Sequence, residues 1–336
     1  MAINYWQGTT DDYLTVANWT EASYPADADE VIFDGRVTQD VVQGMLDEES
    51  GAASKGDFDL LHVKPSFTGD IGTAAEPLCC SPTKVIFEGT GTLHLLCGSA
   101  TQSTDATIPE VIINSNGGTV YLYSNANDGA NTCEFTKVTL TRGTLYIDYY
   151  DVDTDDQGCY VANLFVMPYG NNASSVTVSI DKDCYKVNGA VPMNIYMGNG
   201  SLTTDSQAAI IEMYDGTINF GTALVTAETD LDITTSLSIY GGTFNWYPHD
   251  SGNDAYVNEL HVYGGSFVSS ANTNQPHAKA LGGGAGNDIY LYPGGTINIA
   301  NNYGNISIAA SSQLWNFGGV LTTDRGAQIA ISYDQP

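Results

Sequence analysis

The sequence predicts an all-β fold: a single-chain parallel β-helix, or β-solenoid, with coils of about 25 residues and an N-terminal cap. Three observations support this. A pair of short apolar-alternating segments around a Gly-rich turn recurs along the chain, and outside 37–47 no segment has helical periodicity. Of the 336 residues, 42% are hydrophobic and only 15% charged, and the other polar residues are mostly Thr, Ser, Asn and Gly. The chain therefore has enough apolar side chains for a large core.

The repeat pairs an apolar-x-apolar segment with a Gly-rich turn that leads through Thr or Ser into the next apolar segment. Leu237–Ile239 followed by Gly241–Phe244 is one copy. The Thr or Ser positions lie 27, 25, 26, 23 and 30 residues apart within two groups: Thr92, Thr119 and Thr144, then Thr217, Thr243, Ser266 and Thr296. So short a repeat cannot bury its own apolar face and must pack on the next copy. A β-propeller blade needs about 40 to 50 residues, which favours the solenoid.

The six cysteines are Cys79, Cys80, Cys97, Cys133, Cys159 and Cys184. Cys80, Cys133 and Cys159 occur five residues before an apolar pair, a position that holds Gly or Ala in other repeats. Because free Cys behaves as a small hydrophobic residue, we expect these three to be reduced and stacked in the interior. Cys184 continues the period, whereas Cys79 and Cys97 fall outside this repeated position and are expected only to be buried. No Cys-x-x-Cys is present, which disfavours a zinc ribbon.

Two parts are predicted: an N-terminal cap or anchor segment in residues 1–50 and a β-solenoid domain in residues 51–336. The first part contains Trp6, Asn18-Trp19, Pro25 and the run Val31–Gly35 after Asp29. It resembles the N-terminal cap of right-handed parallel β-helix proteins, including bacterial autotransporter-type passengers. The resemblance implies that these residues open the first coil and cover its edge. No signal peptide or membrane barrel is recognised in the sequence, so export by the autotransporter route is not expected.

Loops leaving the coils are expected at residues 36–55, 64–82 and 272–287, where the sequence is irregular.

The charge is strongly negative, with 10 Lys and Arg against 39 Asp and Glu and a net charge of −29. Such a chain is repelled by phosphate backbones and anionic membranes, so neither a nucleic acid nor a membrane is an expected partner. The charge is interpreted as an aid to solubility or as a match to a basic partner surface.

One acidic cluster is a candidate metal site. Asp151, Asp153, Asp155 and Asp156 could supply oxygen ligands to Ca²⁺. The sequence departs from an EF-hand loop, because the twelfth position is Ala162 and Gly158 is not at the sixth. A solvated acidic loop is the favoured interpretation.

No catalytic residue and no cofactor is predicted, since neither a Gly-x-Ser-x-Gly motif nor a P-loop is present. His62, His94 and His261 lie within strand patterns and are expected on strand faces. Aromatic residues able to stack on sugars are expected instead to form rows on half-buried sheet faces. They are Tyr121, Tyr123, Tyr146, Tyr149, Tyr150, Trp246, Tyr247 and Trp315.

A long acidic solenoid with free cysteines and no catalytic motif resembles the virion structural proteins of tailed bacteriophages. The resemblance implies a non-enzymatic capsid decoration or cement protein, trimeric, assembled in the host cytoplasm, and bound to capsid or other virion proteins. The main alternative is a tailspike or fibre that binds or cleaves host polysaccharide. A surface adhesin of autotransporter style is a third possibility.

Overall fold

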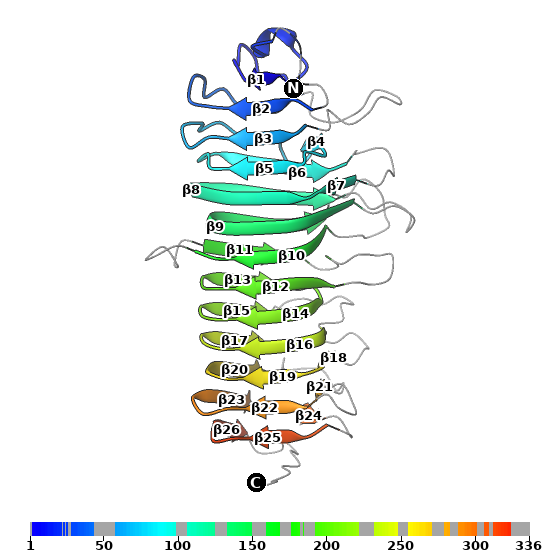
Figure 1. Cartoon of the computed structure of the whole chain (residues 1–336), viewed down its shortest axis with the longest axis vertical. Helices are drawn as coiled ribbons and strands as arrows, with labels where there is room; N and C mark the ends of the chain where they lie inside the picture. Colours follow the sequence, from blue (N-terminus) through cyan, green and yellow to red (C-terminus); the bar gives the residue numbers. More distant parts are fainter. Residues whose placement is uncertain are drawn as a thin grey trace. The chain divides into compact units, whose positions relative to one another are not determined.

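The computed structural model confirms the predicted all-β parallel solenoid (Figure 1). Its one helical turn in the described residues is η1 (Val16–Asn18), and no helix there has the length and hydropathy to cross a bilayer. The chain forms two compact units, Met1–Val191 and Pro192–Pro336. The structure describes residues 2–21, 23, 25, 28–43, 58–98, 106–124, 133–149, 159–168, 176–181, 184, 192–221, 232–247, 255–270, 279–282, 288–300, 306–308 and 312–323.

The first unit is a stack of parallel strands. One ladder follows the order β1, β2, β3, β5, β8, β9 and β10, and a second joins β4, β6, β8, β9 and β11. Strand β7 pairs with the first residues of β9. The bounds are β1 (Ile3–Tyr5), β2 (Glu30–Phe33), β3 (Leu60–Val63), β4 (Leu78–Cys80), β5 (Lys84–Phe87), β6 (Thr92–Cys97), β7 (Ala106–Ile108), β8 (Glu110–Ser124), β9 (Cys133–Tyr149), β10 (Tyr160–Val166) and β11 (Val176–Ile180).

The second unit repeats this arrangement with shorter strands. Its ladders are β12–β14–β16–β19–β22–β25 and β13–β15–β17–β20–β23–β26, with β18, β21 and β24 in a third ladder that begins at β16. The bounds are β12 (Met193–Met197), β13 (Ser201–Thr204), β14 (Ala208–Met213), β15 (Thr217–Phe220), β16 (Ile233–Ile239), β17 (Thr243–Trp246), β18 (Ala255–Val257), β19 (Leu260–Val262), β20 (Gly265–Ser270), β21 (Lys279–Leu281), β22 (Ile289–Leu291), β23 (Gly295–Ala300), β24 (Ile306–Ile308), β25 (Leu314–Asn316) and β26 (Val320–Thr323).

The register of the strands is the register of the sequence repeat. Thr92 pairs with Thr119 and Thr119 with Thr144. In the second unit the paired positions are Thr217, Thr243, Ser266, Thr296 and Val320. Because successive side chains of a strand point to opposite faces, one residue of slip would turn every apolar side chain outward. The repeat therefore fixes the pairing of each coil with the next.

The core consists of apolar columns in which the inward side chain of one coil lies on that of the next. Such columns run Leu61–Val85–Val111–Val138–Leu164 in the first unit and Ile211–Leu237–Leu260–Ile289–Leu314 in the second, all buried. Burying each such side chain stabilises the fold by about 1.5–3 kcal/mol. A single coil would leave this surface in water, so stability depends on contact between coils.

The aromatic residues of the N-terminal segment pack on one another and on β2. The ring of Trp6 lies 5.1 Å from that of Trp19 and 5.8 Å from that of Phe33, between ring centroids. Asn18 is buried, and its side-chain carbonyl accepts hydrogen bonds from the backbone N–H groups of Thr9 and Thr10 at 2.7 and 3.0 Å. The cap thus has its own aromatic core and polar network.

Two of the expected loops take part in the stack. Strand β4 lies within residues 64–82, and isolated parallel bridges join Val41 to Ile71 and Ile71 to Leu93. All three bridge residues are fully buried, so this apolar column places parts of both segments in the coils. The boundary predicted between residues 50 and 51 lies outside the described residues, as does most of 272–287.

Two glycines at the turns of the second unit differ in why glycine is required. Gly242 has φ of +74°, where a side chain strains the backbone, and a Cβ there would overlap the carbonyl oxygen of Gly216 and approach its nitrogen to 2.7 Å. Gly294 has φ of +93°, yet the nearest atom to an added Cβ is the carbonyl oxygen of Tyr263 at 3.8 Å. The first position combines strain with close coil packing, and the second has strain alone.

We therefore expect Gly294→Ala to lower the free energy of unfolding by about 1 kcal/mol, through backbone strain. Gly242→Ala should lower it by about 3 kcal/mol or more, because the coils must also separate. Urea denaturation of both variants measures the difference. Equal losses would show that the close approach of the coils does not limit this corner.

Candidate interaction surfaces

The four candidate calcium ligands, Asp151, Asp153, Asp155 and Asp156, lie outside the described residues, so the calcium site stays a prediction. Within the described part of the chain, His, Cys, Asp and Glu side chains form no group of three or more suited to a metal ion.

All six cysteines are free and buried, as predicted. Five form a cluster in the first unit, which we call the cysteine cluster. Its members are Cys80, Cys97, Cys133, Cys159 and Cys184. Cys97 pairs with Cys80 across β6 and β4 and shares a hydrogen bond with Cys133. Cys159 interacts electrostatically with both Cys97 and Cys184. The repeat position explains Cys133, which is in register with Ala106.

Cys97 is buried, as expected, and the sequence did not predict its neighbours. It enters the cluster because β4, within a segment expected to be a loop, brings Cys80 against it. Cys79 belongs to a separate buried group with Leu96 and Tyr123.

Burial in the interior disfavours ionisation of these thiols and so lowers their reactivity. Burial raises the pKa values of Cys159 and Cys184 well above the usual range. The hydrogen bond with Cys133, followed by burial, does the same to the pKa of Cys97. Because the thiolate is the reactive form, the cluster is built for packing rather than for nucleophilic chemistry.

The three strand histidines lie on outward positions. Nε2 of His62 is 3.1 Å from Glu88 Oε2, and Nε2 of His261 is 2.9 Å from Glu259 Oε1. Nδ1 of His94 is 2.9 Å from the Tyr123 hydroxyl, and burial lowers the pKa of His94. Each histidine is thus held by a neighbour on the sheet face.

Aromatic residues form rows along the outer faces. In the first unit the ring of Tyr121 stacks on His94 at 4.5 Å and on Tyr146 at 4.6 Å, with interplanar angles below 10°. Tyr121 and Tyr146 are half-buried, which confirms the predicted rows for these two. Trp246 differs, because it is fully buried in the core.

A longer row occupies one corner of the second unit, directly after strands β14, β16, β19, β22 and β25. Neighbouring ring centroids are 4.8, 4.8, 4.5 and 5.2 Å apart. We call this row the aromatic corner: Tyr214, Tyr240, Tyr263, Tyr292 and Phe317. The row was not predicted from the sequence, although Tyr240 and Tyr263 each directly precede a Gly-Gly pair of the repeat.

Stacking within the rows affects what they bind. A sugar packs against the flat face of an aromatic ring, but the faces of the inner rings in these rows are covered by their neighbours. Ring edges and hydroxyl groups remain for contact. The hydroxyl oxygens can accept hydrogen bonds from polar or cationic donors, whereas the ring edges offer only packing surface.

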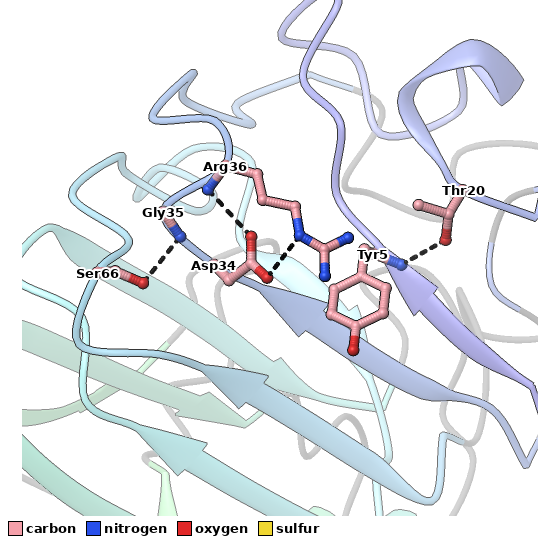
Figure 2. Close-up of polar contacts among 6 residues, drawn as sticks. All are labelled: Tyr5, Thr20, Asp34, Gly35, Arg36 and Ser66. Atoms are coloured by element: carbon pink, nitrogen blue, oxygen red, sulfur yellow. Dashed lines mark hydrogen bonds and ion pairs between the residues drawn. The ribbon is translucent and has the colours of Figure 1, made fainter.

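The corner after β2 holds an exposed cation whose interactions are internal (Figure 2). Nε of Arg36 is 3.2 Å from Asp34 Oδ2, and its guanidinium lies 4.0 Å from the centroid of the Tyr5 ring. The Gly35 N–H donates to Ser66 Oγ at 2.9 Å, and the Tyr5 N–H to Thr20 Oγ1 at 3.0 Å. These contacts join the cap to the first coils.

Comparison of the chain with protein-family models, curated proteins and solved structures gave no match in any of the three.

Burial of the thiols predicts slow modification. In the native protein a maleimide should label the six cysteines about a thousandfold more slowly than in urea, because reaction requires local opening. Thr90→Cys, at an exposed position, supplies a reference thiol that should react at once. Mass spectrometry of the labelled protein gives the rates, and rapid native labelling of Cys80, Cys133 and Cys159 would refute their interior placement.

The raised thiol pKa values also predict loss of stability in alkali. Above about pH 8.5 the unfolded thiols ionise while the folded ones keep their protons, so stability falls as pH rises. Each thiol contributes up to about 1.4 kcal/mol per pH unit. Urea unfolding between pH 7.5 and 9.5, under reducing conditions, should show a shallower loss for a Cys97→Ala/Cys159→Ala/Cys184→Ala variant. Parallel pH profiles would contradict this assignment.

Proposed function

We propose that the chain is a capsid-associated decoration protein on the head of a tailed bacteriophage, which acts through surface contacts without catalysis. The observation that carries the proposal is the parallel solenoid itself, whose outer faces repeat the same side-chain positions from coil to coil. Such faces provide long, regular contact surfaces, which suit attachment to a protein lattice.

Two features support a structural role. Each coil is hydrogen-bonded to the next through parallel ladders, and the buried columns tie the coils together through side chains. The cysteine cluster is reduced, as expected for a protein assembled in a host cytoplasm. The proposed location is the virion, with capsid or other virion proteins as partners and a homotrimer as the assembled form.

A tailspike would need a different kind of surface. A glycan-binding face needs ring faces open to the sugar, whereas the inner rings of the described aromatic rows stack on one another. This geometry favours protein contact over polysaccharide contact.

Immunogold labelling of purified phage particles tests the proposal. Antibodies against the isolated chain should decorate the head, and sedimentation of the purified protein should give the mass of a trimer. Labelling at the tail tip, or release of oligosaccharides from host polysaccharide by the isolated protein, would favour the tailspike. Tail antibodies on the same particles serve as the positional control.

A further inference from the structure

The aromatic corner holds four of the five large hydrophobic side chains that are exposed in the described part of the second unit. Tyr214, Tyr240, Tyr263 and Phe317 keep 50%, 43%, 36% and 54% of their surface accessible. Two residues earlier on the same strands lies a parallel row, in register through the ladder: Glu212, Ser238, His261, Tyr290 and Trp315. Together the two rows form a continuous face across five coils.

The turn itself does not require these aromatic residues. The corner is defined by a backbone N–H that donates to the preceding coil, as Tyr214 does to Met197. In the first unit the same bond is made by Lys64, Glu88 and Met167. Charged and aliphatic side chains thus also occupy this corner, so the aromatic row is a property of the surface rather than of the fold.

Carboxylates border the face. Glu212 Oε2 accepts a hydrogen bond from the Tyr214 hydroxyl at 3.2 Å, and Asp288 Oδ2 accepts one from Trp315 Nε1 at 2.9 Å. Glu259 lies beside His261. Burial, and nearby carboxylates or tyrosines, raise the pKa values of Tyr214, Tyr240 and Tyr263, so their hydroxyls stay protonated and neutral.

Positive charge is scarce in this part of the chain. Residues 192–336 contain 12 Asp and Glu but only Lys279 and Arg325 as strong cations. Lys279 is in β21, which belongs to the third ladder and not to the strands of the aromatic corner. Arg325 lies outside the described residues. The face is thus acidic and aromatic.

These properties select among the possible occupants. A second copy would bring acidic groups against acidic groups, which like-charge repulsion opposes. A sugar would meet ring edges rather than ring faces. A guanidinium suits the face, because its N–H groups donate both to carboxylates and to tyrosine hydroxyl oxygens, while its stem packs on the ring edges.

We propose that the aromatic corner is a docking surface for a positively charged, arginine-bearing protein segment. The proposal deepens the proposed function and rests on its premise that the chain works through protein contacts. It also assigns a role to part of the negative charge, as a complement to a basic partner. Tyrosine-rich patches bordered by charge are typical of the energetically dominant part of an interface.

The test uses the full chain and a fluorescein-labelled peptide of alternating Arg and Ser. A Tyr240→Thr/Tyr263→Thr variant keeps the net charge, so general electrostatic attraction is unchanged. We expect its Kd for the peptide to rise about tenfold. Tyr121→Thr/Tyr146→Thr, in the stacked row of the first unit, is the matched control and should change the Kd less than twofold. Circular dichroism and thermal melting confirm that each variant is folded.

A second pair of variants, which change the net charge equally, distinguishes the effect of the carboxylates beside the corner from the effect of the overall charge. Glu259→Gln and Glu76→Gln each remove one carboxylate, the first beside the corner and the second in the first unit. Only Glu259→Gln should weaken binding clearly, by about fivefold. Equal effects within each pair of variants would overturn the proposal, because peptide binding would then not depend on the aromatic corner.

Two other results would assign a different ligand to the aromatic corner. If cellohexaose binds the native protein and the Tyr240→Thr/Tyr263→Thr variant loses it, the face is a glycan site. If that variant loses self-association in sedimentation experiments, the face joins copies of the chain. Peptide binding and particle location are separate measurements. Head labelling without corner-dependent binding removes only this inference, and corner-dependent binding without head labelling removes only the proposed location.

Discussion

The hydrogen-bonded register between one coil and the next is the constraint on which the other features depend. Parallel pairing places every residue on its equivalent in the following coil, about 4.8 Å away. A residue type that recurs at one position of the repeat therefore becomes a column in space. Thr119 on Thr92, Val111 on Val85 and Tyr240 beside Tyr214 are three results of the same pairing.

This constraint explains why the sequence predicted the fold but only part of the surfaces. The Gly-Gly-Thr repeat fixes both period and register, so the apolar columns followed from the sequence. Cys97 did not, because Cys80 pairs with it only 17 residues away, shorter than the repeat, through β4. The sequence does not predict the aromatic corner for another reason: a residue before Gly-Gly is expected to belong to the turn, and periodicity does not reveal exposure.

In-register stacking also restricts where charge can lie. Two like charges in adjacent coils, at about 5 Å and an effective dielectric of about 20, would repel by about 3 kcal/mol. One outer column of the first unit avoids this repulsion by alternating charge, since Glu110 pairs with Lys84 in the preceding coil and Lys137 in the following one, at 2.7 and 3.2 Å. The hydrogen bond from Lys84 lowers the pKa of Glu110. A column of acids alone would separate the coils.

The second unit uses neutral side chains instead. Its outer columns stack tyrosines, serines and asparagines, such as Asn219 and Asn245, whose side chains share a 2.9 Å hydrogen bond. In one of these columns a carboxylate lies between neutral neighbours, as Glu212 does between Tyr196 and Ser238. At Glu110 the neutralising cations come from the chain itself. Beside the aromatic corner the described residues place His261 as the nearby titratable base, which leaves the strong cation to the proposed partner. The charge balance of the stack thus leads to the same partner chemistry as the exposed rings.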